Sequence, residues 1–110
     1  MKPNRPDTPR QRKKNEDALF RVISKLRTAQ ECRKFFNDLC TPAELQALVD
    51  RWQVVGLLLE GHPYRKIQEQ TGVSVTTIGR VARFMTDGFG GYTIAIEREA
   101  AGKQRKTKAS

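Results

Sequence analysis

Cysteines are few in this chain and long apolar runs are absent, and each shortage excludes a class of protein. Two cysteines, Cys32 and Cys40, are too few for a disulfide framework, which indicates a reducing compartment. No apolar stretch approaches the roughly 18 residues of a membrane-spanning helix. Arg21 and Lys25 interrupt the first hydrophobic segment, so the basic N-terminus is not a secretory signal. We therefore expect a cytoplasmic protein with no membrane contact.

Residues for catalysis or metal binding are equally scarce. His62 is the single histidine, and no second ligand stands at metal-binding spacing, so we predict no metal site. The glycine-rich stretch GFGG at residues 88–91 lacks a following Lys-Ser/Thr, so it is not a phosphate-binding loop. No carboxylate pair or nucleophile–base pair stands out. We predict that the protein is not an enzyme and has no cofactor.

Positive charge is in excess, and it lies at the two ends of the chain. The 110 residues have a net charge of +9, of which residues 1–14 carry +5 and residues 103–110 carry +4, while residues 15–102 sum to zero. Such an excess indicates a polyanionic partner, usually nucleic acid. We expect a disordered basic arm over residues 1–14, one domain over 15–101 and a disordered basic tail over 102–110. On a DNA-binding domain the arm would add phosphate contacts or reach a flanking minor groove.

Apolar periodicity and capping signals predict an all-α body. Asn15 can cap a first helix, TAQE at 28–31 fits a reciprocal capping pattern, and TPAE at 41–44 adds a proline at the first helical position. The predicted helices span residues 15–27, 28–39, 41–60, 63–71 and 74–85. Residues 92–101 fit a helix or a strand, because Tyr92, Ile94 and Ile96 alternate, and we favour the helix.

The third predicted helix is apolar on nearly every side in its last turns, so more than one neighbour must cover it. A chain of this length buries only a modest core alone. We therefore predict a homodimer built through these helices, with a monomer around a thick core as the alternative. The residues assigned to the dimer core are Phe35, Phe36, Leu48, Trp52, Val55 and Leu59.

The stretch QEQTGVSVTTIGR, residues 68–80, predicts two short helices joined by a tight turn. Gly72 can take the positive φ needed at a helix end, and Ser74 can cap the next helix. Val73, Ile78 and Val81 would face inward and fix the angle between the helices. Small hydroxyl and methyl groups then remain outward, where a helix can enter a major groove. The alternative is a plain helical hairpin whose Ser and Thr residues only cap and solvate.

Two segments together resemble the Trp repressor family, in particular its Trp-repressor-like branch of the YerC/YecD type. They are LCTPAELQALVDRW and LLLEGHPYRKIQEQTGVSVTTIGRV. The resemblance covers roughly residues 16–96. It implies an all-α, intertwined helical homodimer with a helix-turn-helix, whose two recognition helices sit about one DNA turn apart on a near-palindromic operator. The DNA-binding residues that it implies, together with the turn chemistry, are Arg65, Gln68, Ser74, Val75, Thr76, Thr77, Gly79 and Arg80.

The founding member of that family is gated by bound tryptophan, and part of its pocket has counterparts here. Thr41, Arg51 and Arg80 stand at matching places. The walls differ, because Val81 and Phe84 stand where the pocket has small residues, and they would fill a slot shaped for an indole. We predict that free tryptophan is not the effector, while another small-molecule co-repressor remains open. Alternatively, Arg80 contacts a phosphate and Arg51 makes a surface ion pair with Asp50 or Glu44.

These patterns leave several functions to compare. The first is a sequence-specific transcriptional regulator, a repressor that occludes a promoter on double-stranded DNA in the bacterial nucleoid. The second is a non-specific nucleic-acid-binding or packaging protein driven by its basic tails. The third is a protein-interaction module whose helix-turn-helix no longer binds DNA, a reading that Gly79 inside the recognition helix keeps open.

Overall fold

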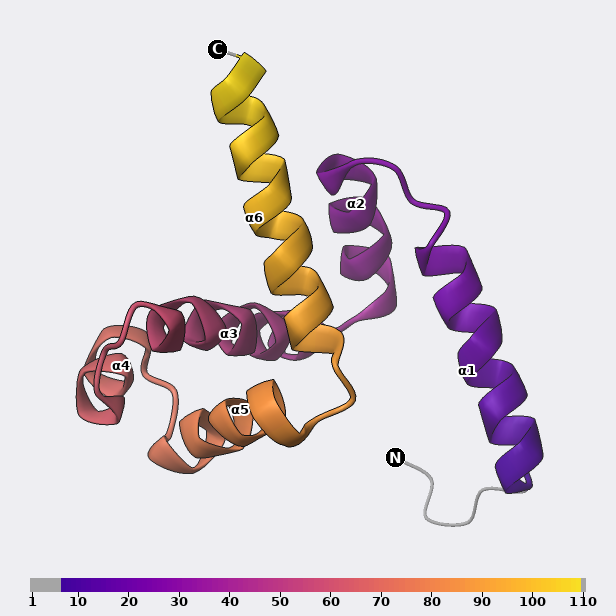
Figure 1. The fold of residues 1–110 in the computed structure, drawn as a ribbon. Coiled ribbons are helices and arrows are strands. Elements are labelled where there is room, and N and C mark those ends of the chain that lie inside the picture. Colours follow the sequence, from indigo (N-terminus) through magenta and orange to yellow (C-terminus); the bar gives the residue numbers. More distant parts are fainter. Residues whose placement is uncertain (1–6, 110) are drawn as a thin grey trace. The chain divides into compact units, whose positions relative to one another are not determined.

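Helices form all the regular structure in residues 7–109, which are the residues that this computed structural model describes, with side chains as far as residue 103 (Figure 1). In chain order they are α1 (Pro9–Ile23), α2 (Ala29–Leu39), α3 (Pro42–Leu59), α4 (Tyr64–Thr71), α5 (Val75–Asp87) and α6 (Gly91–Ala109). The all-α prediction is confirmed, and residues 92–101 are helical. The chain divides into two compact units, with the boundary between Leu45 and Gln46 inside α3.

The first helix begins earlier than the sequence pattern predicted. Thr8 caps it through a reciprocal pair: the Gln11 amide donates to Thr8 Oγ1 over 3.2 Å, and the Thr8 amide donates to Gln11 Oε1 over 2.7 Å. Pro9 occupies the first helical position, where its missing N–H costs nothing. The prediction of a disordered arm over residues 1–14 is therefore wrong for residues 9–14, and residues 1–6 lie outside the described residues.

The C-terminal end shows a similar difference. We expected a disordered tail over residues 102–110, but α6 continues to Ala109, and residue 110 lies outside the described part of the chain. The sequence of this end, AAGKQRKTKA, contains mostly good helix formers, and its lysines and arginines suit the negative end of the helix dipole. Charge density alone was therefore a poor guide to disorder here.

Capping residues fix the starts of α2 and α3. The Glu31 amide donates to Thr28 Oγ1 over 3.0 Å, but Glu31 Oε1 accepts from the Arg27 amide, one residue before the cap that the pattern predicted. At α3 the pair is fully reciprocal, because the Thr41 amide donates to Glu44 Oε1 over 2.8 Å and the Glu44 amide donates to Thr41 Oγ1 over 3.1 Å. The hydrogen bonds from Thr41, the backbone N–H foremost, lower the pKa of Glu44 below its ordinary value.

The first unit has no buried side chain in α1 or α2, although both helices carry apolar residues. Phe35 and Phe36 lie edge to face with their ring centroids 5.5 Å apart, and both are only half-buried. Phe20 is 58 % exposed and Leu39 is 51 % exposed. The apolar stripes of these helices are therefore uncovered in the single chain.

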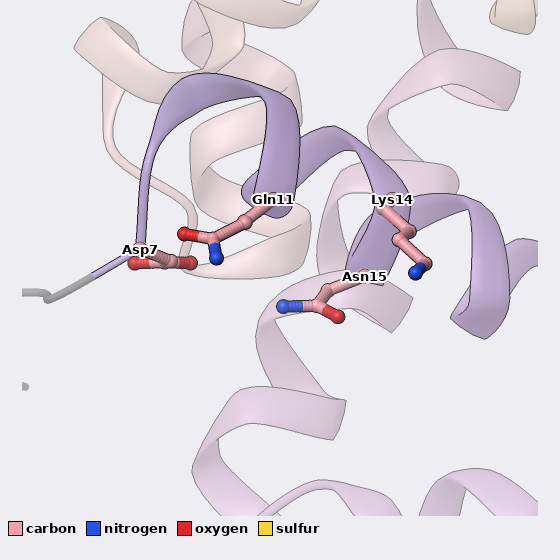
Figure 2. Close-up of a pocket in the computed structure, with 4 residues that line it drawn as sticks. All are labelled: Asp7, Gln11, Lys14 and Asn15. Atoms are coloured by element: carbon pink, nitrogen blue, oxygen red, sulfur yellow. The ribbon is translucent and has the colours of Figure 1, made fainter.

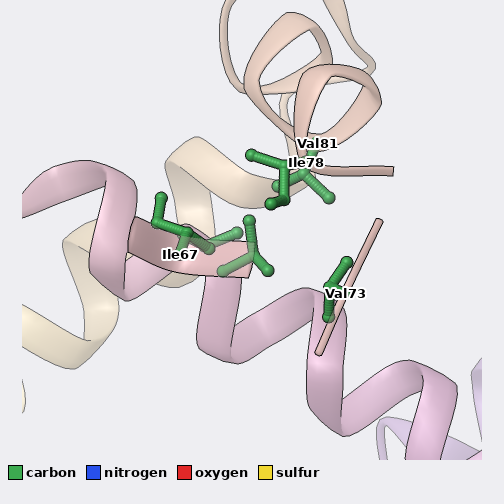
Figure 3. Packing of buried hydrophobic residues seen from close by; sticks show 6 residues of the cluster. Ile67, Val73, Ile78 and Val81 are labelled. Carbon is green, nitrogen blue, oxygen red and sulfur yellow. The ribbon is translucent and has the colours of Figure 1, made fainter. Parts of the chain in front are cut away.

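The second unit has a small core at the junction of α3, α4 and α5 (Figure 3). Figure 3 shows Ile67 of α4 close to Ile78 and Val81 of α5, with Val73 contributed by the turn between them. The buried residues are Val54, Val55, Ile67, Val73, Ile78 and Val81, and around them pack Leu57, Leu58, Met85, Tyr92 and Ile96. Val55 was assigned to the dimer core, but it is 1 % exposed and is already covered inside this unit.

Candidate nucleic-acid interface and the adjoining pocket

The turn between α4 and α5 is held by the glycine and the side chains that the sequence indicated. Gly72 has φ 75°, and its amide donates to the Gln68 carbonyl over 2.8 Å, which ends α4. Thr71 Oγ1 donates to the Ile67 carbonyl over 2.7 Å and accepts from the Val73 amide over 3.1 Å. Because Val73 is also buried, the turn is fixed from both its polar and its apolar side.

The start of α5 is capped by Ser74. Its Oγ accepts from the Thr77 amide over 3.2 Å and donates to Thr77 Oγ1 over 3.0 Å. The Ser74 hydroxyl proton is thus used within the helix, and the Thr77 hydroxyl keeps its own proton for an outside acceptor. Ser74, which we predicted as a DNA contact, therefore acts in this structure as the residue that orders the first turn of α5.

One face of α5 points away from the core of the unit. Val75 is 46 % exposed, Thr76 and Arg80 are exposed, and Gly79 is half-buried. Arg83 is exposed and continues the same face, because it lies four residues after Gly79 and three after Arg80. Sequence reasoning missed Arg83, although its position eight residues after Val75, on the same helix face, was a readable signal.

The residues predicted on α4 are also on the surface. Gln68 is exposed, so it is free to contact a partner. The Arg65 side chain is 91 % exposed, and its Nε lies 3.4 Å from Glu69 Oε1 one turn along the helix. An ion pair this exposed contributes little to stability, so Arg65 can exchange it for a phosphate.

A pocket of about 700 Å³ adjoins this surface within the second unit. It is lined by Arg51, Trp52, Arg80, Val81, Phe84, Phe89, Gly91, Tyr92 and Ala95. The structure thus brings together three of the four predicted effector-pocket residues, while Thr41 belongs to the first unit and caps α3 there. The Trp52 and Tyr92 rings, from α3 and α6, lie 6.4 Å apart along one wall.

Two of the residues that line this pocket are positively charged, Arg51 and Arg80. The Arg80 guanidinium carbon lies 4.7 Å from the centroid of the Phe84 ring, and that of Arg83 lies 5.4 Å from the same centroid. Neither Arg51 nor Arg80 makes an ion pair to any residue of the described chain, and Asp50 accepts instead from Gln46 Nε2 over 2.8 Å. The surface ion pair considered for Arg51 is therefore not formed.

Other hollows and clusters add no comparable site. A polar hollow of about 370 Å³ lies along the start of α1, beside the side chains of Asp7, Gln11, Lys14 and Asn15 (Figure 2). Gln11 already serves the cap of α1. Among the described residues, no three His, Cys, Asp or Glu side chains form a group that could hold a metal ion, and no helix is long and apolar enough to cross a membrane.

Comparisons with known proteins agree on one family. Residues 14–100 match the family described as Trp repressor protein. The uncharacterised protein YerC of Bacillus subtilis is 41 % identical over 99 residues, which cover 90 % of this chain and 92 % of YerC. A TrpR-like protein of Eubacterium eligens superposes with a TM-score of 0.71 and 38 % identity, over 76 % of this chain and 87 % of that one. A candidate Trp repressor of Staphylococcus aureus superposes with a TM-score of 0.74 and is 34 % identical, over 86 % of this chain and 96 % of that one.

Proposed function

Because this chain belongs to the Trp repressor family, a family of DNA-binding regulators, we propose that it is a sequence-specific transcriptional regulator that binds double-stranded DNA through a helix-turn-helix formed by α4 and α5. The observation that carries the proposal is the outward face of α5. It combines a capped N-terminus, the small residues Val75, Thr76 and Gly79, and two exposed arginines, and a rigid turn fixes its angle to α4. A helix end of this kind suits both base edges and phosphates.

We propose further that the active form is a homodimer. α1 and α2 bury no side chain in the single chain, while Phe20, Leu39, Leu48, Trp52 and Leu59 expose 40 % or more of their surface. Apolar stripes of this size require cover, and a second copy supplies it for both chains at once. A two-fold dimer would place two α5 helices on a near-palindromic operator. Binding there represses by occluding a promoter, and the protein works in the cytoplasm, on the nucleoid, with no catalytic step.

The pocket beside α5 is proposed as the site of a small-molecule co-repressor other than tryptophan. Its two unpaired arginines suit an anionic group, and its aromatic walls suit a flat or apolar one. Phe84 stacks on one face of the Arg80 guanidinium, and its ring occupies space in the pocket that an indole would need. Isothermal calorimetry with free tryptophan should show no saturable heat. Binding at micromolar tryptophan would contradict this proposal, and the Phe84→Ser variant tests whether the ring is the obstacle, because it should gain tryptophan binding.

Selection of bound fragments from a genomic DNA library, with full-length protein at near-physiological salt, tests the proposed function. An enriched palindromic motif supports the regulator. Enrichment without a shared motif favours instead non-specific binding by the basic ends, which carry the whole net charge of +9. If no DNA is retained, with or without added small molecules, the chain is a protein-interaction module, and the regulator proposal is wrong.

A further inference from the structure

A glycine in the middle of α5 has no internal reason to be glycine. Glycine destabilises a helix interior relative to alanine, and Gly79 does not have the positive φ that would require it. A Cβ built at position 79 would meet only Cε2 of Tyr64, at 3.9 Å, an ordinary contact distance. The Tyr64 ring thus lies against α5 at position 79, where a Cβ would only touch it and a side chain that extends further toward the ring would displace it.

Tyr64 is the first residue of α4, and its side chain is 41 % exposed. Its hydroxyl makes no hydrogen bond to any described residue of the chain. The ring therefore contributes its apolar body to the contact between the two helices and keeps its polar end for something outside the protein.

The position of this ring relates it to the proposed DNA interface. Gly79 lies three and four residues after Thr76 and Val75, so the ring lies against the helix face that those side chains occupy. Arg65 follows Tyr64 on α4 and Arg80 follows Gly79 on α5, and both are exposed. A hydroxyl without an internal partner, on the face proposed to meet DNA, is placed to donate to a phosphate oxygen.

We propose that Tyr64 is a phosphate-binding residue of this interface, and that position 79, which carries no side chain, leaves the space in which the Tyr64 ring lies against α5. The inference rests on the DNA-binding function proposed above and adds a contact that neither the motif nor the family resemblance assigned. The phosphate carries no sequence information, so Tyr64 orients the protein on the duplex and strengthens binding to all sequences alike. Because the hydroxyl is neutral, this contact displaces no counterion.

Tyr64→Phe removes the hydroxyl and keeps the ring. On a DNA fragment recovered with the wild-type protein, we expect affinity to fall by about tenfold, the typical effect of one hydrogen bond to a charged group. The thermal unfolding midpoint and the dependence of affinity on salt should stay unchanged. Thr93→Val is the control, because it removes an exposed hydroxyl from α6 at a residue outside the pocket and the proposed DNA interface; its DNA affinity should equal that of the wild type.

DNA with single methylphosphonate substitutions, which neutralise one phosphate at a time, gives a readout that a purely structural role of Tyr64 would not move. Neutralising one particular phosphate should weaken DNA binding by the wild type and leave DNA binding by Tyr64→Phe unchanged. In Gly79→Val, whose longer side chain pushes the ring away, the same substitution should also leave the affinity unchanged. If Tyr64→Phe binds as tightly as wild type, or if both respond equally at every phosphate, the assignment of Tyr64 is overturned while the DNA-binding function stands. If the wild type binds no DNA, the proposed function itself fails.

Discussion

Glu44 is the residue whose charge the structure ties most directly to folding. Its pKa is lowered from 4.5 by the Thr41 backbone N–H and then by the Thr41 side chain. Because the pKa of Glu44 is lower in the folded state, its charge stabilises the fold. This stabilisation is fully present above the unfolded-state pKa of 4.5 and is lost as the pH falls through the folded-state pKa. We predict that the free energy of unfolding, measured with urea from about pH 5 to about pH 3, falls more steeply in wild type than in Glu44→Gln.

Glu44→Gln is a sharp control for this titration because glutamine can replace glutamate in the reciprocal cap and carries no titrating charge. The other carboxylates titrate alike in both proteins, so the difference between the two pH profiles belongs to Glu44. Parallel profiles would show that the Thr41 hydrogen bonds do not persist in solution.

At the scale of single residues, local signals were readable and contacts between helices were not. Gly72, Ser74 and Thr41 act as the sequence indicated because each serves a backbone group within four residues of itself. The ring of Tyr64 against Gly79 depends on the angle between two helices, which no spacing rule supplies. The stacking of Arg80 and Arg83 on Phe84 depends on rotamers in the same way.

Among the helices, α5 combines a structural cap with a proposed DNA-facing surface, and the two roles can be separated at Ser74. Ser74→Ala removes the acceptor for the Thr77 amide and should lower the free energy of unfolding by about 1 kcal/mol. The first turn of α5 would fray, so DNA affinity should fall as well. Urea unfolding followed by circular dichroism, paired with fluorescence-anisotropy titration of DNA, measures both effects.

Ser74→Asp distinguishes the cap from the interface. Aspartate caps as well as serine and its charge suits the helix N-terminus, so stability should be kept. The same charge repels phosphates, so DNA affinity should fall further than in Ser74→Ala. An aspartate variant that binds DNA as the wild type does would show that this end of α5 does not approach DNA.

The ends of α1 and α6 show where sequence reasoning went wrong for whole elements. The positive charge of residues 1–14 suggested a disordered arm, but Pro9 is the first residue of a helix that Thr8 caps. The consequence is functional, because an α-helix of roughly 10–12 Å diameter does not enter a minor groove about 6 Å wide. Residues 9–14 can therefore contact phosphates but not read bases in that groove.

At the scale of the whole molecule, the core is too small for the apolar surface around it. In the part of the chain that the structure describes, the fully buried residues all belong to the second unit, whereas α1 and α2 bury none. From the apolar circumference of α3 the sequence predicted that a second copy covers this helix, and five of the six residues assigned to that interface are half-buried or exposed in the single chain. Val55 was assigned incorrectly because periodicity shows which residues are apolar but not which neighbour covers them.

A substitution on an uncovered face tests whether a second copy supplies the cover. Leu39 is 51 % exposed at the end of α2. In a monomer, Leu39→Glu would change stability by no more than about 0.5 kcal/mol, because the side chain already meets water. In a dimer the glutamate would place an unpaired charge inside the interface.

We predict that sedimentation equilibrium shows a dimer for wild type and a shift toward monomer for Leu39→Glu, with lower helicity and weaker DNA binding. Val75→Glu, an equally exposed apolar position on α5, should stay dimeric and lose only DNA binding. If Leu39→Glu leaves the molecular mass unchanged, the interface does not include the end of α2; a monomeric wild type would contradict the homodimer altogether.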